Sequence, residues 1–380
     1  MTNPPSCAHP LRERTRPAFE VGESVVTAVD LFSGCGGLSL GIAQACHDLG
    51  AALDIRLAVD LDIAALKVFE TNFPKASTAN IDLGHIFAGK LGGRPTSEED
   101  RLRDDVGHIQ LLVAGPPCQG HSNLNNHTRR DDPKNGLYLK VARAAEILKP
   151  KITLIENVPS VRHDRGRVVT KTSGWLEEIG YRVADSVIPL EVLGIPQLRR
   201  RHVLLAVDAK LGISPEMIIA QVASGSVERH DLRWAIGDLV KQGGNFGIDR
   251  APAASSTNMA RMRWLLENDK YDLPNALRPV CHQNDQHSYK SMYGRLNWDR
   301  PAQTITSGFG SIGQGRYMHP EVPRALTAHE AARIQGFPDY FEFSPLPMRG
   351  SLATMIANAV PPALARKVIS DVLCEIGLGN

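Results

Sequence analysis

Cysteine is scarce in this chain of 380 residues and occurs without a C-x-x-C pair. This spacing argues against a disulfide framework and a structural zinc site, and it favours a reducing compartment. We therefore predict no metal site. The six cysteines are Cys7, Cys35, Cys46, Cys118, Cys281 and Cys374.

Long apolar runs and a strong charge of one sign are also lacking. No run reaches the roughly 20 residues of a membrane span, and the start lacks the apolar core of a signal peptide. We therefore expect no membrane partner and a cytoplasmic location. The formal net charge of +2 does not by itself indicate a nucleic-acid partner. The length allows one large α/β domain, or one such domain together with a smaller one.

The stretch Gly115–Ser122 reads G-P-P-C-Q-G-H-S and follows an apolar run that is typical of a buried parallel strand. Its glycine and prolines end the strand, so Cys118 should lie on a loop at the strand's carboxyl end. Ligands bind at that edge in open α/β sheets. A thiol there is a candidate nucleophile, although most free cysteines are small buried apolar residues. This stretch alone leaves both interpretations open.

A strand, a glycine turn and a helix are predicted over Val25–Phe32, Ser33–Gly37 and Leu38–Leu49. This order is typical of a dinucleotide- or nucleoside-binding fold, because glycines allow close approach of a ligand to the helix amino terminus. Ser39 stands where the third glycine of G-x-G-x-x-G would be, which disfavours a pyrophosphate site.

Two acids follow further predicted strands. Asp60 comes after Ile55–Val59, where it would accept hydrogen bonds from ribose hydroxyls or else cap the next helix. Glu156 comes after Ile152–Ile155, on the same edge as Cys118, and a carboxylate is costly to bury there unless it is used or paired.

Three consecutive arginines precede the apolar strand His202–Val207. They could form a solvated strand edge that guards against aggregation. Alternatively, Arg199 and Arg201 would share one face of an extended segment and could hold a phosphate or a planar ligand.

The domain organisation is read from changes in pattern. Residues 1–22 have no periodicity and are expected to be a flexible arm. Residues 23–207, completed by 345–380, are expected to form the sheet domain, with an irregular charged insertion at 84–107. Residues 208–344 are poor in periodicity and are expected to be a smaller, loop-rich domain.

Together these stretches resemble the cytosine-C5 DNA methyltransferases over nearly all of residues 25–378. Six motifs occur in that family's order, with a variable region between the fourth and the fifth. They are D-L-F-S-G-C-G-G-L (Asp30–Leu38), G-P-P-C-Q-G (Gly115–Gly120), E-N-V (Glu156–Val158), Q-L-R-R-R (Gln197–Arg201), R-L-N-W-D-R-P-A-Q-T-I-T (Arg295–Thr306), and the closing pair L-T-A-H-E-A-A-R-I-Q-G-F-P-D-Y-F (Leu326–Phe341) and I-A-N-A-V-P-P (Ile356–Pro362).

The resemblance implies an α/β, Rossmann-like methyltransferase sheet that binds S-adenosyl-L-methionine (SAM), with a smaller target-recognition domain at 208–344. It implies methylation of C5 of a flipped-out cytosine in a specific double-stranded DNA sequence. The implied catalytic residues are Cys118, Glu156, Arg201 and Arg199. The implied SAM-binding residues are Phe32, Gly34, Gly36, Gly37, Asp60, Asp82 (with Asn80 as an alternative), Pro117 and Asn358. The implied substrate-binding residues are Gln119, Ser122, Asn157 and Gln197.

Other functions stay open from the sequence. Some members of the family methylate tRNA, although the long variable region favours DNA. A catalytically silent DNA-binding homologue is a third reading, and the retained motifs weigh against it. A nicotinamide-dependent oxidoreductase is disfavoured by the glycine spacing. We expect the chain to be a monomer. The resemblance also allows a restriction endonuclease as its companion.

The Cys118 assignment predicts a covalent trap. DNA carrying 5-fluorocytosine at the target should become bound to the protein, because fluorine cannot leave C5 as a cation. Cys118→Ala should abolish the complex on a denaturing gel. A variant that traps such DNA as well as the parent would refute the nucleophile.

Overall fold

The computed structural model describes residues 9–117, 136–225, 227–241, 247–283, 291–344 and 348–377. These residues form two compact units. The sheet unit comprises the described residues of 17–193, 200–227 and 360–377. The irregular unit comprises those of 9–16, 194–199 and 228–359. None of the described helices is long and apolar enough to cross a membrane.

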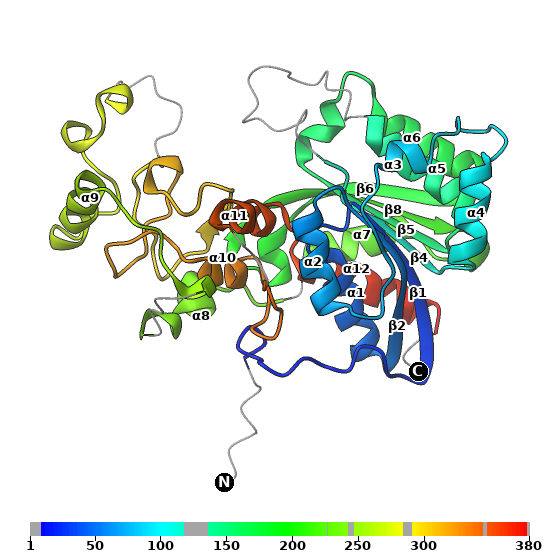
Figure 1. The fold of residues 1–380 in the computed structure, drawn as a ribbon, viewed down its shortest axis with the longest axis horizontal. Helices are drawn as coiled ribbons and strands as arrows, with labels where there is room; N and C mark the ends of the chain where they lie inside the picture. The colour runs from blue at the N-terminus through cyan, green and yellow to red at the C-terminus, as the bar shows by residue number, and fades with distance from the viewer. Residues whose placement is uncertain are drawn as a thin grey trace, which may run out of the picture. The chain divides into compact units, whose positions relative to one another are not determined.

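The sheet unit is built on seven strands in the order β3-β2-β1-β4-β5-β8-β6 (Figure 1). The first five positions are parallel, and β8 is antiparallel to both of its neighbours. The strands are β1 (Ser24–Leu31), β2 (Ala51–Val59), β3 (Thr78–Ala79), β4 (Leu111–Ala114), β5 (Ile152–Asn157), β6 (Tyr181–Pro189) and β8 (Arg200–Asp208).

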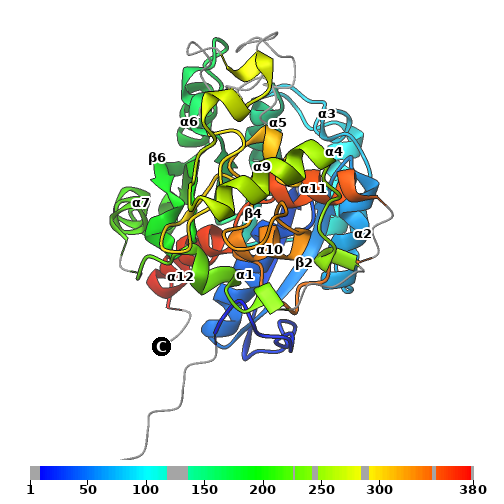
Figure 2. The same ribbon diagram turned by 90° about the vertical axis from the view of Figure 1, so that its left-hand side faces the viewer.

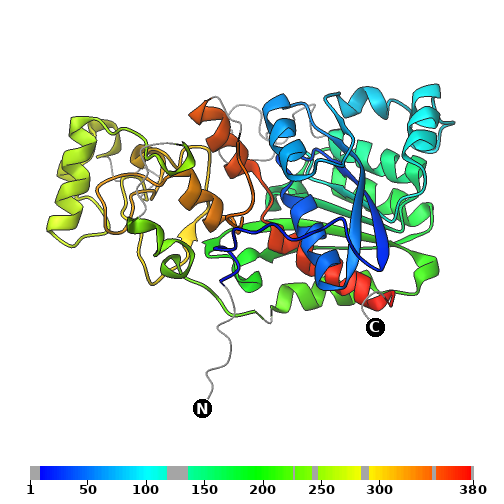
Figure 3. The same cartoon turned by 60° about the horizontal axis from the view of Figure 1, so that its bottom comes forward.

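Helices cover both faces of this sheet (Figures 1 and 3). Helix α12 packs along α1 on one face, and α7 lies next to α12. On the other face α5 packs against α3, α4 and α6. The helices are α1 (Gly37–Asp48), α2 (Ile63–Asn72), α3 (Leu83–Ile86), α4 (Ser97–Val106), α5 (Leu137–Leu148), α6 (Val168–Glu178), α7 (Pro215–Ser224) and α12 (Pro362–Glu375).

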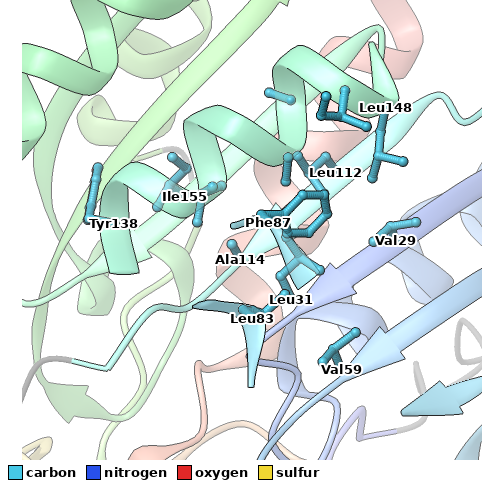
Figure 4. Close-up of a cluster of buried hydrophobic side chains, with 14 of the residues drawn as sticks. Val29, Leu31, Val59, Leu83, Phe87, Leu112, Ala114, Tyr138, Leu148 and Ile155 are labelled. Carbon is cyan, nitrogen blue, oxygen red and sulfur yellow. The ribbon is translucent and has the colours of Figure 1, made fainter. Parts of the chain in front are cut away.

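The core under α5 is made of apolar side chains from the central strands. Phe87, after α3, is fully buried among Leu31, Leu112 and Leu148, as Figure 4 shows. Burying one such side chain stabilises a fold by about 1.5–3 kcal/mol. These contacts hold the central strands in one register, so their carboxyl ends stay at one edge.

The charged insertion that we expected to be irregular is partly helical, so that expectation was wrong. Thr96 caps α4 and Glu99 bonds back to the Thr96 amide, which forms a capping box. Glu99 and Arg143 are both buried and make two hydrogen bonds of 2.9 and 2.7 Å. This pairing satisfies two charges that would otherwise be costly inside the fold.

The domain boundaries also differ from those expected. Residues 208–225 and 227, expected in the smaller domain, belong with the sheet, because α7 packs on β6. Residues 348–359, expected to complete the sheet domain, belong to the irregular unit. Residues 194–199 belong to the irregular unit. In the expected arm, residues 9–22 make packing contacts: Phe19 is 2% exposed, and its carbonyl accepts the Leu53 amide.

The irregular unit has short helices joined by long segments (Figure 2). Its helix α10 is shorter than the motif Leu326–Phe341. The only strand pair in its described part joins β7 and β9. The elements are β7 (Gln197–Leu198), α8 (Leu232–Ile236), α9 (Ser256–Glu267), β9 (Ala302–Gln303), α10 (Ala328–Ile334) and α11 (Arg349–Asn358).

A partly buried network of charged side chains involves His329 and Arg333 of α10. His329 lies between two carboxylates, with Nδ1 2.7 Å from Asp249 and Nε2 2.9 Å from Asp339. Arg333 also donates to Asp339 and to Asp238. Carboxylates only accept, so both ring nitrogens of His329 must carry protons to make both bonds. Burial by itself would lower the pKa of His329, but the bonds to Asp339 and Asp249 outweigh it and raise the pKa.

This network predicts a pH-dependent stability. Because the folded pKa of His329 is raised, its contribution should be complete below about pH 6.5 and should be lost as the pH rises through the folded value. His329→Gln should therefore lower the free energy of unfolding most at acid pH, by about 1–3 kcal/mol.

Urea unfolding followed by tryptophan fluorescence would measure this effect. Three of the four tryptophans, Trp234, Trp264 and Trp298, are in the irregular unit, so the signal reports mainly on it. The exposed His47 lies in the other unit, and His47→Gln serves as the control. A destabilisation by His329→Gln that grows toward alkaline pH would contradict the protonated bridge.

Candidate active site

Strand pairing places several of the predicted residues at one edge of the sheet unit. Leu31, at the end of β1, pairs with Val59 of β2 and with Ala114 of β4, and Ala114 pairs with Ile155 of β5. The segments that follow these residues therefore leave the sheet side by side. The order also changes direction at β1, which has β2 on one side and β4 on the other, and ligands bind at such a switch point.

The glycine turn after β1 has an unusual backbone. Phe32 has φ 59° and Gly36 has φ 97°, a region that side chains disfavour. A methyl group added to Gly36 would lie 2.8 Å from the Phe73 ring, and one added to Gly37 would overlap the carbonyl oxygen of Val360. Gly34 also has a positive φ, 54°, but has open space where its side chain would be. Glycine is therefore required at 36 and 37 for packing, while Gly34 leaves room above the turn.

Asp60 is bound to the glycine turn. Its Oδ2 accepts the Gly34 amide at 2.8 Å and its Oδ1 accepts the Asp62 amide at 2.8 Å. Burial raises the pKa of Asp60. The helix-cap alternative was wrong for this residue, since the cap of α2 is Asp62. Each Asp60 oxygen keeps a lone pair that can accept a further hydroxyl.

Three large apolar side chains in the segments that follow β2 and β3 are exposed. Leu61 is 65% exposed, Ile63 60% and Ile81 46%. Asp82, next in the chain, caps α3 by accepting the Gly84 amide at 2.7 Å. Asn80 is exposed and donates to the Asp60 carbonyl at 3.0 Å. The choice between Asp82 and Asn80 for adenine therefore stays open, beside an apolar surface that suits a flat base.

Asp30 is a feature that the sequence reasoning missed. It is 1% exposed, Ser39 donates to its Oδ2 at 2.6 Å, and its Oδ1 has no hydrogen-bond partner. Burial raises its pKa to about 7. The sequence could have pointed to Asp30, because it is the first residue of the motif that contains the glycine turn.

The segment that leads to the predicted nucleophile is tied to β5. Asn157 is buried, donates to the Pro116 carbonyl at 3.2 Å, and accepts the Val158 amide at 2.8 Å. We expected Asn157 to bind substrate, but these contacts occupy its side chain in holding the segment Gly115–Pro117. Cys118, Gln119 and Ser122 lie outside the described residues.

Glu156 is paired with Arg201 across the β5–β8 boundary. The Arg201 Nε is 2.5 Å from Glu156 Oε1, although the contact lacks the angle of a hydrogen bond. Both side chains are largely buried, at 9% and 13% exposed. A methyl group added to Gly115 would lie 3.7 Å from Glu156 Oε2, so the carboxylate lies against the start of the Gly115–Pro117 segment.

Arg199 and Gln197 come from the same motif as Arg201, and their polar groups have partners inside the protein. Both are buried in the irregular unit. Arg199 donates to the carbonyls of Ala357 and Ala359, and Gln197 donates to Gln335 at 2.8 Å. These polar groups therefore make structural hydrogen bonds to residues that are distant in the chain. Asn358 is exposed at the end of α11 in the same unit.

One edge of this sheet carries a glycine turn of the nucleoside-binding type, a carboxylate placed to bind a ribose, and a buried acid–arginine pair. Together with the strand order, these features define a Rossmann-like methyltransferase. A family model described as C-5 cytosine-specific DNA methylase matches residues 26–374, and the chain belongs to that family. It is a DNA (cytosine-5-)-methyltransferase.

Characterised relatives agree. The chain is 44% identical over 355 residues to Type II methyltransferase M1.BsuMI of Bacillus subtilis, covering 93% of this chain and 82% of that protein. It is 32% identical to Type II methylase M.HgiDII of Herpetosiphon aurantiacus, covering 92% and 95%. The S. pombe Dnmt2 methyltransferase structure has the same fold, with a TM-score of 0.61 at 18% identity over 93% of this chain and 99% of that chain.

The Asn157 contacts predict a stability and rate effect. Asn157→Asp removes the donor to Pro116 and adds a buried charge beside Glu156, so it should lower the free energy of unfolding by about 1–3 kcal/mol. It should also slow single-turnover methylation, because the Gly115–Pro117 segment loses its tie. Asn268→Asp is the matched control, since the exposed Asn268 makes the same type of bond to the Trp264 carbonyl. Equal, small effects in both variants would contradict the role of Asn157.

Proposed function

We propose that the chain transfers a methyl group from SAM to C5 of a flipped-out cytosine in a specific double-stranded DNA sequence, through a covalent Cys118–C6 adduct. The observation that carries this proposal is the buried Glu156–Arg201 pair beside Gly115. Cys118 is the third residue after Gly115 and directly follows the described part of that segment. A nucleophile and an acid held at one strand edge are what addition to a pyrimidine requires.

The Cys118 thiolate would form a bond to C6, and the C5–C6 double bond would place its electrons on C5. Glu156 would hold N3 and give it a proton, which relieves the negative charge on the ring. Arg201 would keep the carboxylate in place, and its N–H groups can donate to the base carbonyl or to a neighbouring phosphate. After C5 has gained the methyl group, loss of the C5 proton returns electrons to the ring and expels the Cys118 thiolate, and N3 returns its proton to Glu156. The target base must leave the stack first, at a cost of a few kcal/mol.

The residues present fit SAM. Gly34 leaves room above the turn, and Asp60 has spare acceptor sites next to exposed apolar side chains. SAM supplies the electrophilic methyl group. The residues that would hold it are Phe32, Gly34, Gly36 and Gly37 for its amino-acid part, Asp60 for the ribose, Asp82 or Asn80 for adenine, and Pro117 and Asn358 as further contacts.

We further propose that the variable region within residues 208–344 reads the DNA sequence, supported by its place between the fourth and the fifth of the motifs quoted above. Gln119 and Ser122 would contact the flipped base. The Type II names of the relatives support a companion restriction endonuclease. We propose a monomer that acts in the cytoplasm, where its DNA substrate would lie.

Genome mapping tests the function. The protein would be expressed in a bacterium that lacks cytosine methylation of its own, and 5-methylcytosine would be mapped across the genome. We expect methylation in one fixed short context, which Cys118→Ser should abolish. An unmethylated genome together with a folded protein that binds SAM would overturn the DNA assignment and favour tRNA.

A further inference from the structure

Residues 162–171, called here the basic turn, concentrate positive charge. The segment reads R-H-D-R-G-R-V-V-T-K and holds four Arg and Lys residues and a histidine against one acid. The whole chain has a formal net charge of only +2. The basic turn runs from the 3-10 helix η2 (Pro159–His163) into the first turn of α6.

The basic side chains of this segment are exposed to solvent, whereas its single acidic side chain is buried. Arg162, Arg165, Arg167 and Lys171 are all exposed. Asp164 is 6% exposed, and its Oδ2 accepts the Val168 amide at 3.4 Å. The single negative charge is therefore folded inward to shape the turn, and the outer surface is positive.

The basic turn is held firmly on the sheet unit. Val161 and Val168 are buried in the core under α5, at 1% and 3% exposed. Arg162 lies 3.4 Å from Asp185 of β6, and Asp185 also accepts a 2.9 Å bond from His202 of β8. A preorganised cationic surface loses little freedom when it binds an anion.

Its position places it near the candidate site. Arg162 is six residues after Glu156, so their backbones lie at most about 20 Å apart, the length of about six base pairs of DNA. The acidic helix α4 leads directly into the amino end of β4, at the opposite edge of the sheet. The basic turn follows the carboxyl end of β5 and is thus separate from this acidic helix.

We propose that the basic turn binds backbone phosphates of duplex DNA on the side of the flipped cytosine, as a contact additional to the recognition region. This inference rests on the proposed function. Phosphate contacts fix the register of a protein on a duplex without reading its sequence. The basic turn would therefore add affinity equally for methylated and unrelated sites.

The test removes two charges from the basic turn. Arg167→Asn/Lys171→Gln leaves the Arg162–Asp185 pair intact, and asparagine tolerates the φ of 55° at position 167. The control is Lys149→Asn/Lys210→Gln, which also removes two exposed charges, one of them at a φ of 50°. Lys149 precedes β5 and Lys210 follows β8, so both lie at the opposite edge.

Binding of a short fluorescent duplex would be measured over a range of salt concentrations, together with SAM binding. Each lost phosphate contact should reduce the slope of log affinity against log salt by about 0.9. The basic-turn variant should thus lose about 1.8 of slope, for duplexes with and without the methylated context, while the control and SAM binding stay unchanged.

The outcomes separate the two proposals. A parent protein that neither binds nor methylates duplex DNA would defeat the proposed function. A parent that does both, with a basic-turn variant whose salt slope equals that of the control, would overturn this inference alone. A variant that loses affinity only for the duplex containing the target sequence would also overturn this inference, because phosphate contacts do not distinguish sequences.

Discussion

The backbone register of β1, β4 and β5 is the constraint on which the site depends. Leu31, Ala114 and Ile155 are consecutive partners across these parallel strands, so the glycine turn, the Gly115–Pro117 segment and Glu156 lie at one level at the carboxyl end of the sheet. The register is fixed by apolar side chains such as Leu31 and Leu112, which pack under α5. A slip of one residue would turn these side chains out of the core and separate the polar groups.

Much of the sheet unit was predictable, because its signals are local. The apolar runs that end in Gly115 and Glu156 placed both residues at strand ends, where the structure has them. The alternation of Arg199 and Arg201 was also a local signal, but it was misleading. Arg199 is fixed by carbonyls more than 150 residues later, at Ala357 and Ala359, and no short-range pattern shows such partners.

Charge was the hardest property to interpret from the sequence. Helix α4 is rich in acids and was expected to be irregular, although its capping-box spacing, Thr96 to Glu99, was visible. The burial of Glu99 depends on Arg143, which only the fold brings near. His329 is a similar case, since its charged form follows from carboxylates at Asp249 and Asp339 that flank α10 in space.

The packing of α1 against α12 has a consequence for synthesis of the protein. The carbonyl oxygens of Val360 and Pro362 occupy the space beside Gly37 and Gly41, so the first helix of the sheet unit is completed by the last one. The two helices are separated by more than 300 residues of chain. A ribosome must therefore translate the whole irregular unit before Val360 can pack beside the glycine turn. Native closure of the sheet unit is thus a late event in folding.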